Sequence, residues 1–245
     1  MRLVGVGVGP GDPELLTLAA LRELQAADTV FVPVLSADEQ GRAESVVRAH
    51  CGDDERVQRL VFALSDPVDG PQQRRRAKWD QAAEAVVQRL RECRGTVAFA
   101  TLGDPSVYST FSYLAQTVRQ LLPEVELATV PGITAMQATA SQAGVALTEG
   151  AESLTVVPVM RDVSVLREAL AARGTVVAYK GGRRLSELRS VIAEHGALDR
   201  SVYAEHLGTP DARVLPLSEV PETGAAPYLS TVVVLPPRGG RGEQW

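Results

Sequence analysis

The sequence predicts an α/β protein made of two α/β domains, and two observations support this. Short apolar runs of strand length alternate with segments whose apolar residues recur at helical spacing over most of the 245 residues. Aromatic residues make up only 4% of the chain, so small and branched aliphatic side chains must fill a core of helices packed on a mostly parallel sheet. The pattern restarts after Pro123. We therefore expect domains over residues 1–122 and 123–245, with a cleft between them.

The first domain is expected to open with a buried strand over residues 3–8 and a helix over 15–24. Asp12 should cap this helix, because Asp is a favoured N-cap and Pro13 suits the first helical position. Gly95 is expected to end a later helix as its C-cap. The other elements expected before Pro123 are strands over 29–34, 56–63 and 96–101, and helices over 42–50, 79–93 and 107–122.

The second domain repeats the alternation and then departs from it. Its last quarter holds strand patterns without helices between them, so the second sheet is expected to be mixed. The tail after residue 236 is rich in glycine and arginine, and we expect it to be frayed. The expected elements are strands over 125–130, 154–159, 175–179, 201–205 and 231–235, and helices over 134–143, 163–173 and 184–195.

Composition excludes several functional classes. The net charge is −5, and no basic stripe typical of a nucleic-acid binder occurs. Cys51 and Cys93 form no disulfide framework or Cys-x-x-Cys pair, and the three histidines lack metal-ligand spacing. No apolar run approaches the length of a membrane span. We expect a cytoplasmic protein without a protein-bound metal and without nucleic-acid or membrane partners.

The first glycine-rich loop resembles a dinucleotide fingerprint but departs from it. After Gly5 and Gly7, the pattern G-x-G-x-x-G would require glycine at Pro10 or at Asp12, depending on where the count starts. A pyrophosphate needs backbone N–H donors and positive potential. Pro10 lacks the donor, and Asp12 would repel phosphate. The loop therefore argues against a nicotinamide-dependent dehydrogenase and favours a ligand without phosphates, such as a nucleoside that carries a sulfonium.

Two further turns, over residues 102–105 and 131–134, each follow an apolar strand and precede a helix. In open α/β sheets, ligands bind in the crevice beyond the carboxyl ends of the strands. One such turn is ordinary, because Gly, Pro and Asp are common turn residues. Three turns at one sheet edge predict a ligand site.

These motifs together resemble the tetrapyrrole methylase family, in matching order and spacing over roughly residues 2–235. Within the family, the chain is most similar to members that methylate carbon 20 of precorrin-2. Two departures are Ala146, where proline is common, and Leu207, where alanine is common. The stretches that carry the family resemblance are residues 6–12 with 16–17, 103–105 and 130–135. Those that carry the narrower one are 42–45, 103–114, 131–138 and 227–230.

The resemblance implies S-adenosylmethionine as cofactor, bound between the two domains, and a homodimer. Met160 would pack on the adenine, although plain core packing is the alternative for a buried methionine. An adenine is held by an apolar slot with a few placed polar atoms. The implied cofactor contacts are Pro10, Leu102, Gly103, Asp104, Val107, Thr134, Ala135, Met160, Gly208 and Thr231.

The implied reaction is methyl transfer to carbon 20 of precorrin-2, giving precorrin-3A in cobalamin biosynthesis. Asp104 is the candidate to stabilise positive charge or to accept the proton that leaves the methylated carbon. The alternative is a turn aspartate that accepts hydrogen bonds from its own backbone. Arginines bind carboxylates through a bidentate fork, but a charge run is also typical of a solvated helix start. The substrate-binding candidates are Tyr108, Ser109, Arg74, Arg75 and Arg76.

The sequence is also compatible with other functions. A related tetrapyrrole methylase could act on the cobalt-containing form of the substrate, on uroporphyrinogen III, on another precorrin carbon or on a diphthamide precursor. A module that senses nucleotides without catalysis could use the same site. The sequence does not distinguish a metal-free from a cobalt-containing macrocycle.

Overall fold

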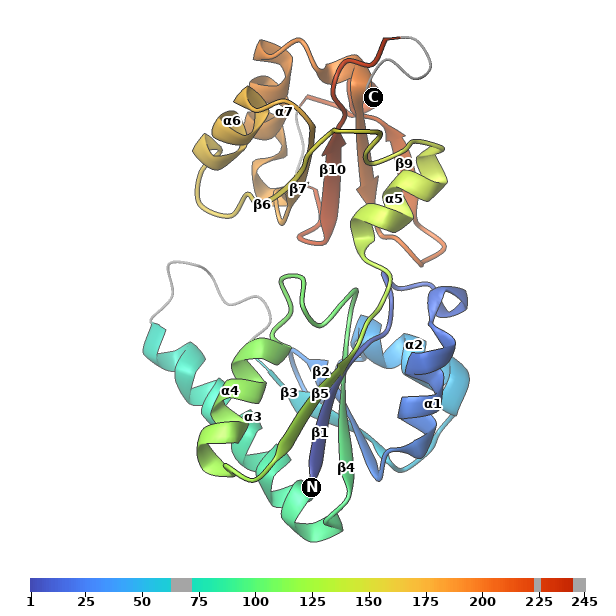
Figure 1. Ribbon diagram of the computed structural model, residues 1–245, viewed down its shortest axis with the longest axis vertical. Helices are drawn as coiled ribbons and strands as arrows, with labels where there is room; N and C mark the ends of the chain where they lie inside the picture. Colours follow the sequence, from blue (N-terminus) through green and yellow to red (C-terminus); the bar gives the residue numbers. More distant parts are fainter. Residues whose placement is uncertain (63–71, 223–225, 240–245) are drawn as a thin grey trace. The chain divides into compact units, whose positions relative to one another are not determined.

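The computed structural model describes residues 1–62, 72–222 and 226–239. The chain divides into two compact units, Met1–Thr134 and Ala135–Trp245, and each unit has its own five-stranded sheet with flanking helices (Figure 1). This confirms the α/β class. The division lies later than residue 122, because β5 (Glu126–Val130) pairs in parallel with β1 (Arg2–Gly7) and completes the first sheet.

The first sheet is parallel throughout, with the strand order β3-β2-β4-β1-β5. All its strands therefore end at the same edge, and the loops that follow them meet there. The remaining strands are β2 (Thr29–Val34), β3 (Val57–Val61) and β4 (Thr96–Thr101).

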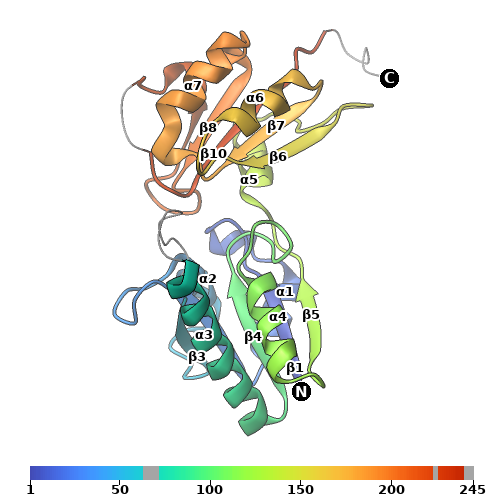
Figure 2. The same cartoon turned by 90° about the vertical axis from the view of Figure 1, so that its left-hand side faces the viewer.

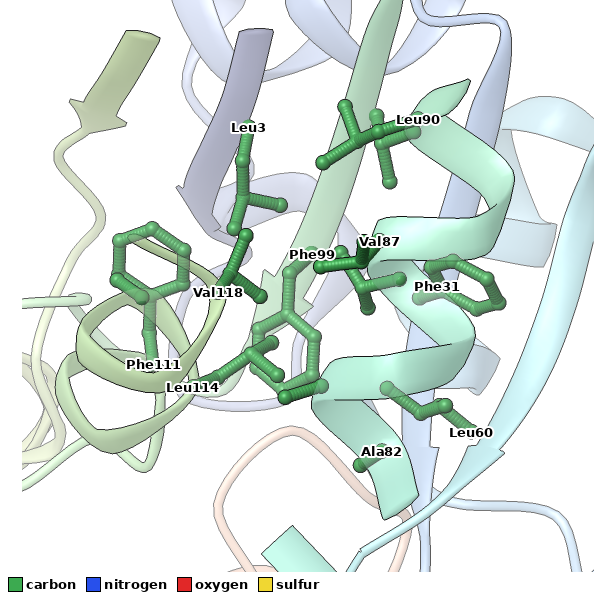
Figure 3. Packing of buried hydrophobic residues seen from close by; sticks show 14 of the residues in the cluster. Leu3, Phe31, Leu60, Ala82, Val87, Leu90, Phe99, Phe111, Leu114 and Val118 are labelled. Atoms are coloured by element: carbon green, nitrogen blue, oxygen red, sulfur yellow. The ribbon is translucent and has the colours of Figure 1, made fainter. Parts of the chain in front are cut away.

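Helices cover both faces of the first sheet. Leu3 and Val4 are adjacent in β1 and both fully buried, yet they belong to different clusters, because successive strand side chains point to opposite faces. Figure 3 shows Leu3 beside Phe99 and Val118, between the sheet and two helices. The helices are α1 (Leu18–Ala26) and α2 (Arg42–Cys51) on one face, and α3 (Gln72–Cys93) and α4 (Phe111–Leu121) on the other (Figure 2).

Two expected helix ends differ in detail. Asp12 does accept a hydrogen bond from the Glu14 N–H (2.9 Å), but it caps a short 3-10 helix, Pro13–Leu15, whereas Thr17 caps α1. The left-handed residue after α3 is Arg94, with φ 51°, and not Gly95. Gly95 has a different role, because a Cβ there would lie 2.1 Å from an Asp28 carboxylate oxygen.

The second sheet has the order β6-β7-β10-β8-β9, and it is mixed as expected. β6 and β7 are parallel, while β10 runs antiparallel to both of its neighbours. The sequence reading missed β9, a short edge strand that ends in Pro216; proline is accepted at such an edge. The strands are β6 (Leu154–Pro158), β7 (Thr175–Tyr179), β8 (Ser201–Glu205), β9 (Arg213–Pro216) and β10 (Ser230–Val234).

The helices of the second unit cover its sheet on two sides. α5 (Ala135–Ala143) packs against β10, β8 and β9. α6 (Ser164–Ala171) and α7 (Leu185–Glu194) pack together on the other side (Figure 1). Across the described ranges, no helix combines the length and the apolar character that crossing a membrane requires. Further short 3-10 helices lie at Gly182–Arg184, Leu198–Arg200 and Leu217–Glu219.

The segment after β10 is held in place beyond the point where fraying was expected. The Arg238 guanidinium donates two hydrogen bonds to the Glu152 carboxylate, at 3.0 and 2.7 Å, and a third to the Ala146 carbonyl at 3.0 Å. Such a charge-assisted fork orders the backbone that carries it. The expected fraying therefore does not begin at residue 236, and residues 240–245 lie outside the described residues.

Candidate functional site

The loops after β1 and β4 are joined by backbone hydrogen bonds at the carboxyl edge of the first sheet. The Gly103 N–H donates to the Gly9 carbonyl (2.7 Å), and the Gly9 N–H donates to the Gly103 carbonyl (3.4 Å). The Val8 N–H also donates to the Thr101 carbonyl at 2.9 Å. Two of the three predicted turns are therefore hydrogen-bonded to each other.

The loop after β5 joins the other two through Asp104. Its carboxylate Oδ2 accepts a hydrogen bond from the Gly132 N–H at 3.0 Å. The approach is so close that only glycine fits, because a Cβ on Gly132 would lie 2.2 Å from the Gly103 carbonyl oxygen. A Cβ on Gly7 would likewise lie 2.6 Å from the Gly132 nitrogen. The expected convergence of the three turns is present within the first unit.

Asp104 is a nearly buried carboxylate with strong acceptor bonds on both oxygens. Its side chain also accepts hydrogen bonds from the Ser106 N–H (2.8 Å) and from the Ser106 hydroxyl. Burial by itself would raise the pKa of Asp104, but the bonds from Ser106 and Gly132 outweigh it and leave the pKa below its usual value. Asp104 is therefore a carboxylate at neutral pH and a weak proton acceptor. The bond from the Ser106 N–H matches the alternative role considered for Asp104, that of a turn aspartate that accepts hydrogen bonds from nearby backbone.

Next to Asp104, the Cα of Gly103 faces open space, while its N–H and carbonyl are bonded to Gly9. Gly103 has φ 68°, and among the described residues outside its chain neighbours only the Thr134 Cα comes within 4 Å of the place of its absent Cβ, at 4.0 Å. Pro10 and Thr134 are buried, and Leu102 and Val107 are half-buried. Open space beside an ionised carboxylate fits a positively charged ligand without phosphates, such as the sulfonium nucleoside that the resemblance implies.

The two substrate candidates that follow Asp104 have different environments. The Ser109 hydroxyl shares a hydrogen bond with the Thr101 hydroxyl (2.9 Å) and accepts one from the Phe111 N–H (3.1 Å), so Ser109 holds the start of α4. Tyr108 has a left-handed φ of 50°, which is rare for an aromatic residue, and its side chain is exposed. Backbone strain of this kind is found most often at functional sites. Tyr108 therefore remains the stronger of the two candidates.

The arginine triplet lies in the first turns of α3. This position agrees with the alternative interpretation of the three arginines, in which they form the start of a helix. Arg76 is exposed, while the side chains of Arg74 and Arg75 lie outside the described residues. Their binding to substrate carboxylates stays a prediction.

The predicted cofactor residues of the second unit follow its strands. Met160 comes after β6 and is exposed, so its side chain does not serve as core packing. Gly208 has φ 75° in the loop after β8, a conformation that favours glycine. Thr231 is buried in β10, opposite Tyr179 and Ala204. Ala135 begins α5.

One functional candidate escaped the sequence reading. The hydroxyl of Tyr179, at the end of β7, accepts a hydrogen bond from the Met136 N–H in the first turn of α5, at 2.8 Å. The two residues are far apart in sequence, and no motif links them.

In the part of the chain that the structure describes, no group of three or more His, Cys, Asp or Glu side chains is arranged to hold a metal ion.

Comparison with known proteins defines the class. The profile of the tetrapyrrole (corrin/porphyrin) methylases matches residues 2–221, and the chain belongs to this family. A precorrin-2 C(20)-methyltransferase from Sinorhizobium sp is 35% identical, over 95% of this chain and 94% of its own. A cobalt-precorrin-2 C(20)-methyltransferase from Salmonella typhimurium is 29% identical over 95% of each chain.

The solved structures support the fold. A uroporphyrin-III C-methyl transferase from Thermus thermophilus, complexed with S-adenyl homocysteine, superposes with a TM-score of 0.64 at 21% identity. The match covers 96% of this chain and 92% of that one. At this identity the likeness concerns the fold alone, and it confirms the architecture that the resemblance implied.

Proposed function

We propose that this protein transfers a methyl group from S-adenosylmethionine to carbon 20 of precorrin-2, giving precorrin-3A in cobalamin biosynthesis. The observation that carries the proposal is the alignment with the Sinorhizobium C(20)-methyltransferase, which spans almost the full length of both chains. The site geometry is compatible with it, because the loop after β4 offers open space at Gly103 beside the ionised carboxylate of Asp104.

The chain's own residues have to bind and orient the reactants. When bound, S-adenosylmethionine supplies a methyl group that is already activated on a sulfonium. Catalysis then depends mainly on holding the acceptor carbon in line with that methyl group, at about 3–3.5 Å. In this proposal Leu102 and the open side of Gly103 contact the methionine end, with Pro10 and Val107 against it, and Asp104 braces these loops.

Asp104 serves in this proposal as a charge-stabilising group. A carboxylate next to a cation lowers the energy of the charged ligand. Because hydrogen bonds hold the pKa of Asp104 below its usual value, proton acceptance is the less favourable of the two roles considered for it.

The other predicted contacts complete the proposal. Thr134, Ala135, Met160, Gly208 and Thr231 are assigned to the adenosine part. Tyr108 and Arg76 are assigned to the macrocycle and its carboxylates, and Ser109, Arg74 and Arg75 remain candidates for the same task. The composition supports a cytoplasmic protein and the resemblance a homodimer, and analytical ultracentrifugation tests the dimer directly.

The decisive experiment supplies the purified protein with S-adenosylmethionine labelled with ¹³C in its methyl group. Precorrin-2, its cobalt-containing form and uroporphyrinogen III are offered separately, and NMR locates the label. We expect one new methyl group on carbon 20 of precorrin-2. Preference for the cobalt form would select the function named for the Salmonella relative. Label at another carbon would overturn the assignment. Cofactor binding without methylation of any macrocycle would indicate a sensing module.

A further inference from the structure

The chain passes from the first unit to the second only once, between Thr134 and Ala135. A hydrogen bond within each unit fixes the backbone on either side of this passage. On one side, the Gly132 N–H is bonded to Asp104, inside the first unit (3.0 Å). On the other, the Met136 N–H is bonded to the Tyr179 hydroxyl, inside the second unit (2.8 Å). Residues 133–135 lie between the two anchors.

Tyr179 is well placed to act as a fixed anchor. It lies in β7, an interior strand between β6 and β10, and its backbone is aligned with Pro158 on one side and Thr231 on the other. Its carbonyl accepts a hydrogen bond from the Val159 N–H at 2.8 Å, and its side chain is only 9% exposed. The sheet therefore fixes where the hydroxyl lies.

The partner of this hydroxyl is a group that the helix itself leaves unpaired. The first four N–H groups of an α-helix have no intrahelical acceptor, and Met136 is the second residue of α5. Without Tyr179, the first turn of α5 would lose this bond to its own sheet. A hydrogen bond of this kind contributes modestly to stability, and a modest free energy is enough to shift the balance between two backbone arrangements several-fold.

We propose that Tyr179 is a positioning residue for the cofactor: by holding the Met136 N–H, it keeps the first turn of α5 in the arrangement in which Thr134 and Ala135 contact S-adenosylmethionine. The inference rests on the proposed function, since it assumes that these two residues contact the cofactor. Tyr179 itself need not touch the cofactor or the substrate.

The proposal predicts a specific kinetic pattern for Tyr179→Phe. If the competent arrangement falls to between a half and a tenth of the population, the dissociation constant of S-adenosylmethionine rises about two- to tenfold. Saturating cofactor restores the arrangement, so kcat should stay within about a factor of two while KM for the cofactor rises. A residue with a purely structural role would lower the folded fraction without this split.

The test combines titration calorimetry with S-adenosylhomocysteine and hydrogen–deuterium exchange. In Tyr179→Phe we expect weaker binding and faster exchange of the Met136 amide, which binding of S-adenosylhomocysteine should slow again. Ser201→Ala is the matched control. It removes another buried hydrogen bond of the same unit, from the Ser201 hydroxyl to the Ala197 carbonyl (2.7 Å). Ser201 pairs with Val234, at the end of β10 far from Thr231. This control should leave affinity and Met136 exchange unchanged.

Unchanged affinity in Tyr179→Phe would overturn the proposal, whether or not exchange at Met136 accelerates. Equal losses of affinity in the variant and in Ser201→Ala would also overturn it. If Tyr179→Phe does not fold, Met136→Pro removes the donor instead, because proline is accepted in the first helical turn. Failure of the unmodified protein to bind the cofactor would contradict the proposed function, and is thereby distinguished from failure of this inference.

Discussion

The carboxylate of Asp104 accepts a hydrogen bond from the backbone N–H of Gly132, and this contact joins the loop after β4 to the loop after β5. With the pair of backbone bonds between Gly9 and Gly103, it makes one rigid edge out of three separate turns. A ligand that binds there meets a preformed site, so the ordering of these loops does not have to be offset by binding energy.

Asp104→Asn tests this brace. An amide cannot accept hydrogen bonds on both of its ends, so either Gly132 or Ser106 loses its acceptor. Leaving a buried donor without a partner costs about 1–3 kcal/mol of unfolding free energy. We expect that loss in urea unfolding, together with weaker binding of S-adenosylhomocysteine in calorimetry. Asp12→Asn is the control, because Asn caps a helix as well as Asp does. Normal turnover and normal cofactor affinity in Asp104→Asn would remove Asp104 from the site.

Gly132→Ala tests the close approach of the loops. The added Cβ would lie 2.2 Å from the Gly103 carbonyl oxygen, so the backbone has to move. Overpacking costs typically about 1–3 kcal/mol, and we expect the upper end of this range and loss of cofactor binding. In the control, Gly52→Ala, the residue has φ 61°, and no atom of the described residues beyond its chain neighbours lies within 4 Å of the new Cβ. That change should cost about 1–3 kcal/mol, because φ 61° with ψ −147° is a backbone conformation that side-chain-bearing residues rarely adopt, and it should leave cofactor binding intact. Equal affinity in both variants would contradict the prediction.

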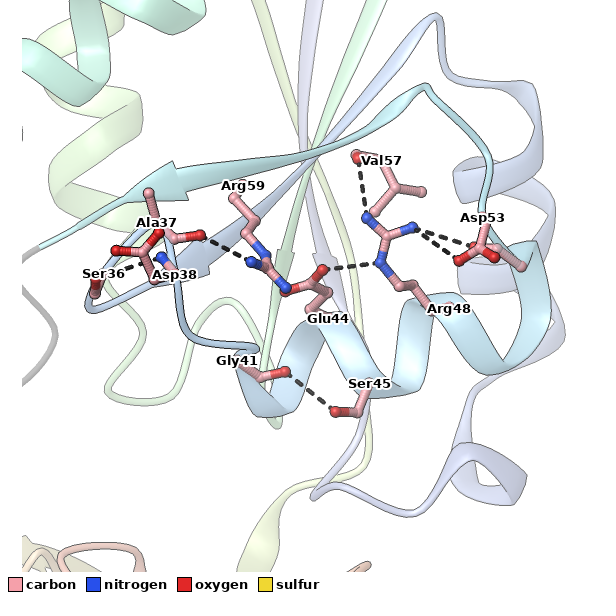
Figure 4. Close-up of polar contacts among 11 residues, drawn as sticks. Ser36, Ala37, Asp38, Gly41, Glu44, Ser45, Arg48, Asp53, Val57 and Arg59 are labelled. Carbon is pink, nitrogen blue, oxygen red and sulfur yellow. Dashed lines mark hydrogen bonds and ion pairs between the residues drawn. The ribbon is translucent and has the colours of Figure 1, made fainter.

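Glu44, like Asp104, is a buried carboxylate of the first unit. It is fully buried in α2 and accepts hydrogen bonds from the Nε atoms of Arg48 and Arg59, each at 2.8 Å (Figure 4). Arg59 also donates to the Ala37 carbonyl (2.8 Å), in the loop after β2. The network therefore ties this loop to α2.

Glu44→Gln should destabilise the protein by about 2–4 kcal/mol. Breaking a fully buried ion pair costs about 3–5 kcal/mol, and the cost is lower here because both guanidiniums keep contact with water. Chemical unfolding measures the difference. The control is Glu92→Gln, which breaks the exposed pair with Arg89 and should change stability by less than about 1 kcal/mol. A similar small effect in both variants would show that the Glu44 network contributes little.

Acid should weaken the first unit through the same carboxylates. Burial alone would raise the pKa of Glu44, but its bonds to Arg59 and Arg48 outweigh this and lower the pKa, as hydrogen bonds do for Asp104. A carboxylate with a lowered pKa contributes stability above its unfolded-state pKa of about 4, and this stability is lost as the pH falls through the folded-state value. We therefore expect the advantage of the unmodified protein over Glu44→Gln to be constant near pH 7 and to shrink below about pH 4. Parallel stability curves from pH 7 to pH 3 would contradict this.

Much of the architecture can be predicted from local pattern. Buried parallel strands must be short apolar runs, and glycine, proline and aspartate end them, so the strand-to-helix turns and the sheet edge that they share are visible in the sequence. The mixed character of the second sheet follows from strands that lack helices between them. Cofactor class follows from the broken glycine pattern and from the family motifs. Met160 is exposed, so plain core packing, the alternative considered for it, does not apply, and its contact with the adenine stays a prediction.

Pairing between distant segments is not visible in this way. The strand after Pro123 belongs to the first sheet because β5 hydrogen-bonds with β1, a contact between segments far apart in the chain. Asp104 becomes a brace only because Gly132 approaches it, and Tyr179 becomes an anchor only because the first turn of α5 packs beside the end of β7. Propensity and periodicity act over a few neighbouring residues, whereas these contacts depend on how complete layers pack. They therefore became apparent only once the chain was folded.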